Sequence, residues 1–169
     1  MTYFIWLLRI IHILSGIFWV GGTLMMAFFI APTIGATAEA GQKFVGHLMG
    51  NLKFSNRMSA AAGSTVLAGI ILYGLDARAG AAWQRSGFAI GLSIGAGFAI
   101  IGFIFGILIG RTTKAMAQLG AQFQGKPTNE QMAQMQSIRK QQATYSNISA
   151  IALILAVIFM ATARYLGMG

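Results

Sequence analysis

Two ionisable residues, Arg9 and His12, lie inside a long apolar segment near the start of the chain. This segment covers about residues 3–31 and is long enough to cross a bilayer. Because ionisable groups are costly in hydrocarbon, residues in such places usually have a function. A neutral imidazole is a common axial ligand of haem iron, so His12 is the candidate metal ligand of this chain.

The neighbours of His12 extend this hypothesis along one helical face. Residues spaced three or four apart share a face, as do Arg9, His12, Gly16 and Trp19. In a haem site, Arg9 would hold a propionate by a charge-assisted hydrogen bond. Gly16 would leave room for the flat macrocycle, and Trp19 would pack against it. The alternative is structural: His12 hydrogen-bonds a neighbouring helix, and Arg9 extends to the membrane surface.

A second axial ligand is less evident. The only other histidine is His47, which lies in the connection after the first apolar segment and is expected at the opposite membrane face. Met160, in the last apolar segment, is expected at the depth of His12 and would give His/Met ligation. Methionine is also a common filler of apolar cores. Two copies of His12 meeting across a homodimer axis are the third possibility.

The composition predicts an all-α integral membrane protein. Charged residues make up 9% of the chain, against roughly 25% in soluble proteins. The chain forms one domain, residues 1–169, with four apolar segments at about residues 3–31, 58–75, 87–110 and 148–166. We therefore expect a four-helix bundle in a lipid bilayer. The net charge of +9 resides mainly in the connections, which indicates lipid head groups rather than nucleic acid.

Two of the connections have helical character of their own. Pro32 is expected to end the first helix. Residues 39–56 are amphipathic, which predicts an interfacial helix or an extension of the second span. In the third connection, residues 111–145, Thr128 and Gln131 have the spacing of a capping box after a glycine–proline break. This pattern predicts a helical hairpin that protrudes from the membrane.

The third apolar segment has a stripe of small residues. At about 100° per residue they fall on one side of the helix, which favours close approach of another helix in this chain, a second copy or a larger membrane complex. The stripe consists of Gly87, Gly91, Gly95, Ala99, Gly102, Gly106 and Gly110.

Charges in the connections predict the orientation. The first and third connections hold eight cations, and the opposite side holds four. The positive-inside rule then predicts an inner-membrane protein with both termini outside and the hairpin in the cytoplasm. The eight are Lys43, Lys53, Arg57, Arg111, Lys114, Lys126, Arg139 and Lys140; the four are Arg9, Arg78, Arg85 and Arg164.

Three sequence stretches carry a resemblance to known families: RIIHILSGIFWVGG, KFSNRMSAAAGSTVLAGIILYG and MATARYLG. The chain resembles small four-helix membrane proteins related to the CopD copper-resistance domain, and uncharacterised families near it. HemJ-type protoporphyrinogen oxidases share the early histidine–tryptophan–glycine helix. The resemblance implies a four-helix membrane bundle whose first-helix histidine, here His12, binds haem. Trp19, Gly21 and Gly22 match the packing motif beside it.

Two functional hypotheses follow. The first is a bundle that binds one b-type haem (haem b) through His12 for electron transfer or redox sensing. The second is a cofactor-free accessory or structural subunit of a larger membrane complex. The chain has no cysteine, which excludes covalent haem attachment. It also lacks a Ser-His-Asp set, paired carboxylates and a phosphate loop, so the sequence gives no support to hydrolase chemistry.

Overall fold

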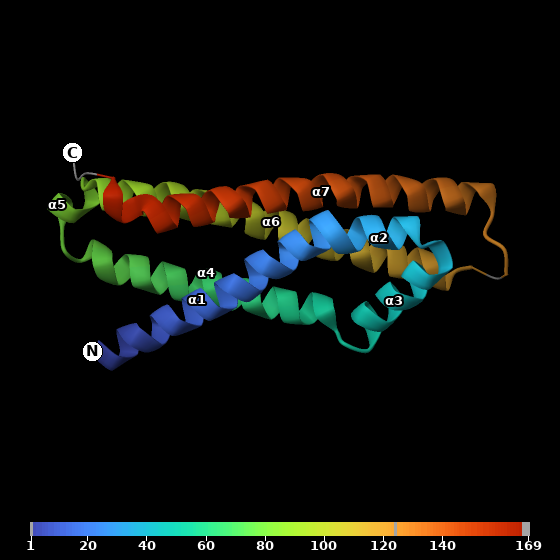
Figure 1. Cartoon of the computed structure of the whole chain (residues 1–169), viewed down its shortest axis with the longest axis horizontal. Coiled ribbons are helices and arrows are strands. Elements are labelled where there is room, and N and C mark those ends of the chain that lie inside the picture. Colours follow the sequence, from blue (N-terminus) through green and yellow to red (C-terminus); the bar gives the residue numbers. More distant parts are fainter. Residues whose placement is uncertain (1, 124, 167–169) are drawn as a thin grey trace.

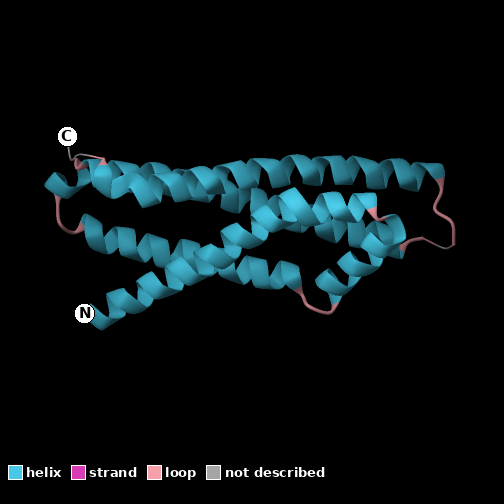
Figure 2. Cartoon of the chain, in the orientation of Figure 1, coloured by secondary structure: helices cyan, strands magenta, loops and turns pink. Residues whose placement is uncertain are grey.

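The computed structural model describes residues 2–123 and 125–166, and these residues contain helices and loops but no strand (Figure 2). The elements are α1 (Thr2–Met25), the π-helix η1 (Met26–Ile30), α2 (Ala31–Ala36), α3 (Ala38–Gly50), α4 (Phe54–Ala77), α5 (Ala81–Gln84), α6 (Gly87–Ala121), α7 (Asn129–Thr162) and the 3₁₀ helix η2 (Ala163–Tyr165).

Within the described residues, four helical stretches are long and apolar enough to cross a membrane: Thr2–Ala36, Phe54–Ala77, Gly87–Ala121 and Asn129–Tyr165. They form two pairs. Helices α6 and α7 lie side by side over nearly their whole length, and α1 crosses α4 (Figure 1). The N-terminal half of α1 diverges from the α6–α7 pair, and α1 contacts α4 where the two helices cross (Figure 1). The predicted all-α membrane helical bundle is confirmed.

The two pairs meet around Trp19. Its side chain is 4% exposed and packs with Ala62 of α4 and Leu153 of α7. Its indole ring also meets the ring of Phe103, on α6, edge to face with 6.1 Å between the ring centroids. One residue from each of the four long helices therefore contributes to this core cluster. Burial of a large aromatic ring here joins the α1–α4 pair to the α6–α7 pair.

The prediction that the first helix ends at Pro32 is wrong. Helical structure continues from Thr2 to Ala36, with Pro32 in the first turn of α2. A proline ring in an α-helix clashes with the carbonyl four residues earlier. Here a π-helical turn precedes the proline, and the Ala31 N–H bonds to the carbonyl of Met26, five residues back. The wider turn changes the hydrogen-bond register before the ring is reached, so the chain continues in the same direction.

The amphipathic segment forms a helix of its own. Helix α3 ends at Gly50, and α4 begins at Phe54. Between them Lys53 has a φ of 49°, a left-handed conformation that breaks the helical path. The structure therefore selects a separate amphipathic helix over an extension of the second span.

The predicted helical hairpin is confirmed. Helix α6 continues to Ala121, and α7 runs from Asn129 without a break into the last span. The Thr128 hydroxyl accepts a hydrogen bond from the Gln131 N–H at 3.2 Å, and the Gln131 side chain accepts one from the Thr128 N–H at 3.0 Å. This reciprocal capping box starts α7 where the sequence pattern places it.

The glycine stripe is used inside the chain over part of its length. Gly91, Gly95 and Gly102 are buried against α7 and the residues that follow it. A Cβ added at Gly95 would lie 3.1 Å from the carbonyl oxygen of Ala156, which is a backbone contact. A Cβ added at Gly106 or Gly110 would meet nothing within 4 Å. An interface between the stripe and a second copy or a larger complex stays a prediction. The residues of the stripe that are left open for it are Gly106 and Gly110.

Candidate functional site

The His12 side chain is anchored to α4. Its Nδ1 lies 2.8 Å from the backbone carbonyl oxygen of Thr65. A carbonyl oxygen only accepts, so Nδ1 donates the proton of this hydrogen bond. The neutral ring then keeps its lone pair on Nε2. The ring also lies against Gly69, where an added Cβ would be 2.9 Å from Cε1 of the imidazole.

This geometry bears on both interpretations of His12. It matches the structural alternative, in which the histidine hydrogen-bonds a neighbouring helix. It also matches the usual arrangement of a histidine that binds a metal, which donates one ring N–H to a carbonyl group and coordinates with the other nitrogen. The hydrogen bond fixes which nitrogen is free, and it orients the ring.

Thr65 organises the α1–α4 contact beyond its carbonyl group. Its side chain is buried, and its hydroxyl donates to the carbonyl of Ala61 at 2.8 Å. Its Cγ2 methyl lies 3.5 Å from the position that a Cβ of Gly16 would occupy. Gly16 therefore faces Thr65 at ordinary van der Waals distance. The space beside Gly16, predicted to hold a macrocycle, is occupied by Thr65 of α4.

Trp19 and Arg9 have different environments. Trp19 is buried in the core where the four long helices meet, so it packs against protein. Arg9, one turn before His12, is exposed. In the part of the chain that the structure describes, the only ion pair joins Lys43 to Glu39. Arg9 therefore has no acidic partner among these residues.

Met160 and His47 lie away from the α1–α4 contact. Met160 packs against α6, where its Cγ would be 2.7 Å from a Cβ added at Gly95. His47 is exposed in α3, in the connection between the first and second spans. The structure thus brings together His12 and Gly16 at α4 and places Met160 at the α6–α7 contact. Among the described residues, no three His, Cys, Asp or Glu side chains gather as a metal site would need.

Thr65 and Gly69 were missed by sequence reasoning. Their spacing of four places them on one face of α4, which was an available signal. The second span contains so many small residues that this pair did not stand out.

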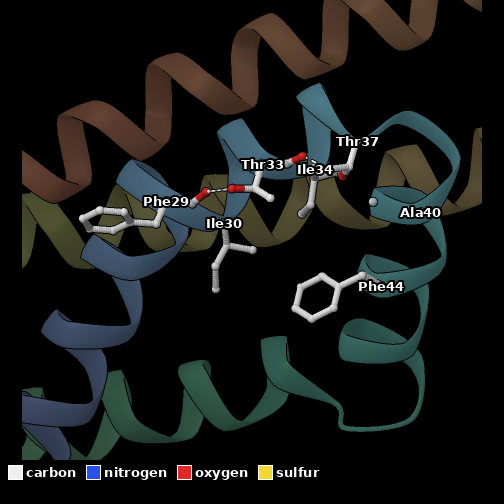
Figure 3. A pocket seen from close by; sticks show the side chains of 8 residues that line it. Phe29, Ile30, Thr33, Ile34, Thr37, Ala40 and Phe44 are labelled. Carbon is white, nitrogen blue, oxygen red and sulfur yellow. Dashed lines mark hydrogen bonds between the residues drawn. The ribbon is translucent and has the colours of Figure 1, made fainter.

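A second feature missed from the sequence is an apolar hollow of about 350 Å³ beside α2 and α3 (Figure 3). In Figure 3 the Ile30 and Phe44 side chains extend into the space between the two helices. The hydroxyls of Thr33, on α2, and of Thr37, directly after it, are occupied locally: Thr33 donates to the carbonyl of Phe29, and Thr37 to that of Thr33. The hollow therefore offers apolar surface and few free polar groups. Its lining residues are Phe29, Ile30, Thr33, Ile34, Thr37, Ala40, Gly41 and Phe44.

Comparisons with protein-family models, with curated proteins and with solved structures give no match for this chain.

Proposed function

We propose that this membrane protein binds one b-type haem, with Nε2 of His12 as an axial ligand. The observation that supports this proposal is the 2.8 Å hydrogen bond from Nδ1 of His12 to the Thr65 carbonyl oxygen. It holds the imidazole in the tautomer that a ferrous or ferric ion needs, with the lone pair on Nε2. When bound, the haem would supply one-electron chemistry, which fits electron transfer or redox sensing.

Arg9 has the place and the charge to bind a propionate. It precedes His12 by three residues, which is close to one helical turn, and its guanidinium has no acidic partner in the described chain. Arginine binds carboxylates through two parallel hydrogen bonds. Because Arg9 lies nearer the membrane surface than His12, the propionates would point toward that surface.

In this proposal Gly16 and Trp19 position the ligand. Gly16 lets α1 approach Thr65, and Trp19 fixes α1 against the other long helices. The macrocycle would then lie along the diverging N-terminal half of α1. A second iron ligand would come from a second copy of His12 or from a small ligand, because Met160 packs against Gly95 at the α6–α7 contact.

The test is a visible spectrum of the protein purified from haem-replete cells. We expect a Soret band and a b-type spectrum after reduction. His12→Ala should abolish the band, because it removes the only histidine of the first span. Arg9→Ala should weaken haem retention. His47→Ala is the matched control and should leave the spectrum unchanged, because His47 is exposed on α3. A colourless protein, or a spectrum that survives His12→Ala, would contradict the assignment.

A cofactor-free accessory subunit is the second candidate. The observation that favours it is that His12, Gly16 and Trp19 all contact other helices. Residues engaged in this way account for the α1–α4 pairing without any cofactor. The same spectrum separates the two candidates: a colourless protein whose His12→Ala variant unfolds at lower temperature supports the accessory role.

We further propose an inner-membrane location with both termini outside, from the eight cations in the first and third connections and the four on the other side. The α6–α7 hairpin would then extend into the cytoplasm. A relation to the CopD-like families remains part of the proposal and rests on the three sequence stretches quoted above.

A further inference from the structure

Four cations lie at one level of the α6–α7 hairpin. The hydrogen bond from Gln142 Nε2 to Thr113 Oγ1, at 2.8 Å, sets the register of the two antiparallel helices. Counted from this pair at about 1.5 Å per residue, all four lie within a layer roughly 8 Å thick. We call them the cation ring: Arg111, Lys114, Arg139 and Lys140.

The cation ring has members on opposite sides of the hairpin. Thr113 faces α7, and Arg111 precedes it by two residues, which places Arg111 about 160° away on the helix. Gln142 faces α6, and Lys140 precedes Gln142 by two residues, which likewise places Lys140 about 160° away from Gln142 on the helix. These two cations therefore point away from the hairpin on opposite sides. All four ring residues are exposed.

No acidic residue neutralises the cation ring. The chain has three acidic residues. Glu39 is paired with Lys43, and Asp76 lies near the other end of α4, close to the opposite membrane face. Glu130 precedes Arg139 by nine residues, about 14 Å along α7. Nothing in the described chain thus balances this charge locally.

The height of the cation ring matches lipid head groups. Arg111 directly follows the last residue of the apolar segment 87–110 of α6. The head-group layer of one leaflet is about 5–8 Å thick, similar to the layer occupied by the four cations. A protein partner that docks from one side needs charge on one face, whereas lipid head groups can approach the exposed sides of the hairpin from more than one direction.

We propose that the cation ring binds anionic phospholipid, through phosphodiester head groups of the leaflet that the hairpin crosses. Each lysine or arginine at a membrane surface attracts anionic lipid, and four at one height add their effects. The bound lipid lies against the exposed sides of the hairpin. This inference does not depend on haem, because its residues are outside the α1–α4 contact.

The test measures lipid selectivity at the protein surface. The full chain is reconstituted into vesicles of roughly equal phosphatidylcholine and phosphatidylglycerol, and spin-labelled versions of each lipid report how strongly each associates. We expect at least about a threefold preference for phosphatidylglycerol. In the variant Arg111→Gln, Lys114→Gln, Arg139→Gln, Lys140→Gln, the preference should fall to about one. Raised sodium chloride should reduce the wild-type preference.

Three controls make the result specific. The variant Lys43→Gln, Arg78→Gln, Arg85→Gln, Lys126→Gln loses the same charge from exposed positions elsewhere and should keep most of the preference. The variant Arg111→Lys, Arg139→Lys replaces two arginines by lysines, keeps the positive charge of the ring and should retain the preference for phosphatidylglycerol. Excess inorganic phosphate, at matched ionic strength, should not abolish it, since head groups are fixed in the membrane plane.

Four results would overturn the proposal. They are no preference in the wild type, an undiminished preference in a folded ring variant, an equal loss in the control variant, and complete displacement by inorganic phosphate. Should the four-residue variant fail to fold, the variants Arg111→Gln, Lys114→Gln and Arg139→Gln, Lys140→Gln each remove half the charge. Each pair should lower the preference, and no change in either would contradict the ring.

Discussion

At the scale of single residues, the conformation of His12 depends on the absence of a side chain at Gly69. The imidazole lies so close to α4 that a methyl group would be 2.9 Å from its Cε1 and 3.1 Å from its Nδ1. The hydrogen bond to the Thr65 carbonyl is available because the ring is allowed to approach the backbone. Gly69 on α4 thus provides the space that His12 on α1 needs to form this hydrogen bond.

Gly69→Ala tests this pair. The new methyl group should displace the ring, break the Nδ1 hydrogen bond and lower the free energy of unfolding by about 1–2 kcal/mol. Thermal unfolding in detergent measures the change. Gly63→Ala on the same helix is the control, since a Cβ there meets nothing within 4 Å. If haem is bound, only Gly69→Ala should alter its spectrum. Equal stability of the two variants would show that the contact with His12 is unimportant.

The sequence identifies His12 as the unusual residue of the candidate site, but it does not predict which residues of α4 contact it. An imidazole inside an apolar span is visible in the sequence, because its cost in hydrocarbon marks it. Its contacts are set by how α1 crosses α4, and that crossing depends on which small residues face each other. Thr65 and Gly69 share a face of the second span, but that span has many other small residues, so their spacing alone does not single them out.

At the scale of elements, the capping box shows where a local sequence pattern is sufficient to predict structure, and the proline shows where it is not. Thr128 and Gln131 satisfy each other within one turn, so their spacing is sufficient to predict the start of α7. Pro32 ends an α-helix by the same local logic, yet the helical path continues. The π-helical turn before it depends on five consecutive residues and their packing, which no short motif encodes.

Glycines of α6 give a matched pair of substitutions. Gly95→Ala should lower the free energy of unfolding by about 1–3 kcal/mol, because its Cβ would lie 3.1 Å from the Ala156 carbonyl oxygen and force the backbones apart. Gly97→Ala, two residues on, meets nothing within 4 Å and should leave stability unchanged or raise it slightly. Unfolding in detergent compares them. Similar losses in both would attribute the effect to the helix itself and not to its contact with α7.

At the scale of the whole molecule, the four apolar spans and the hairpin were predictable because each depends on composition over many residues. The pairing of α1 with α4 and of α6 with α7 follows the chain order, and the glycine stripe indicates the closer pair. The burial of Trp19 where the two pairs meet was not predictable. Tryptophan in a membrane helix serves equally as a lipid-facing anchor, and only the crossing of the two pairs places it inside.

The orientation of the whole chain is testable by labelling, since the chain has no cysteine. A single cysteine at Lys126, between α6 and α7, should react with an impermeant maleimide only after the membrane is opened. A cysteine at Arg85, between α5 and α6, should react in intact cells. This outcome follows from the larger number of cations on the hairpin side. The reverse labelling pattern would place both termini in the cytoplasm.

The position of Trp19 also has a mechanical consequence. Thr2 and Ala36, the two ends of the first helical path, both lie 17 residues from Trp19. Each arm is therefore about 25 Å long. A tilt of about 5° around this fulcrum moves each end by about 2 Å, and the two ends move in opposite directions. A rigid tilt of this kind would move the N-terminal end in one leaflet and the α2–α3 junction near the other leaflet by equal amounts, and it would have to break the hydrogen bond from His12 to the Thr65 carbonyl.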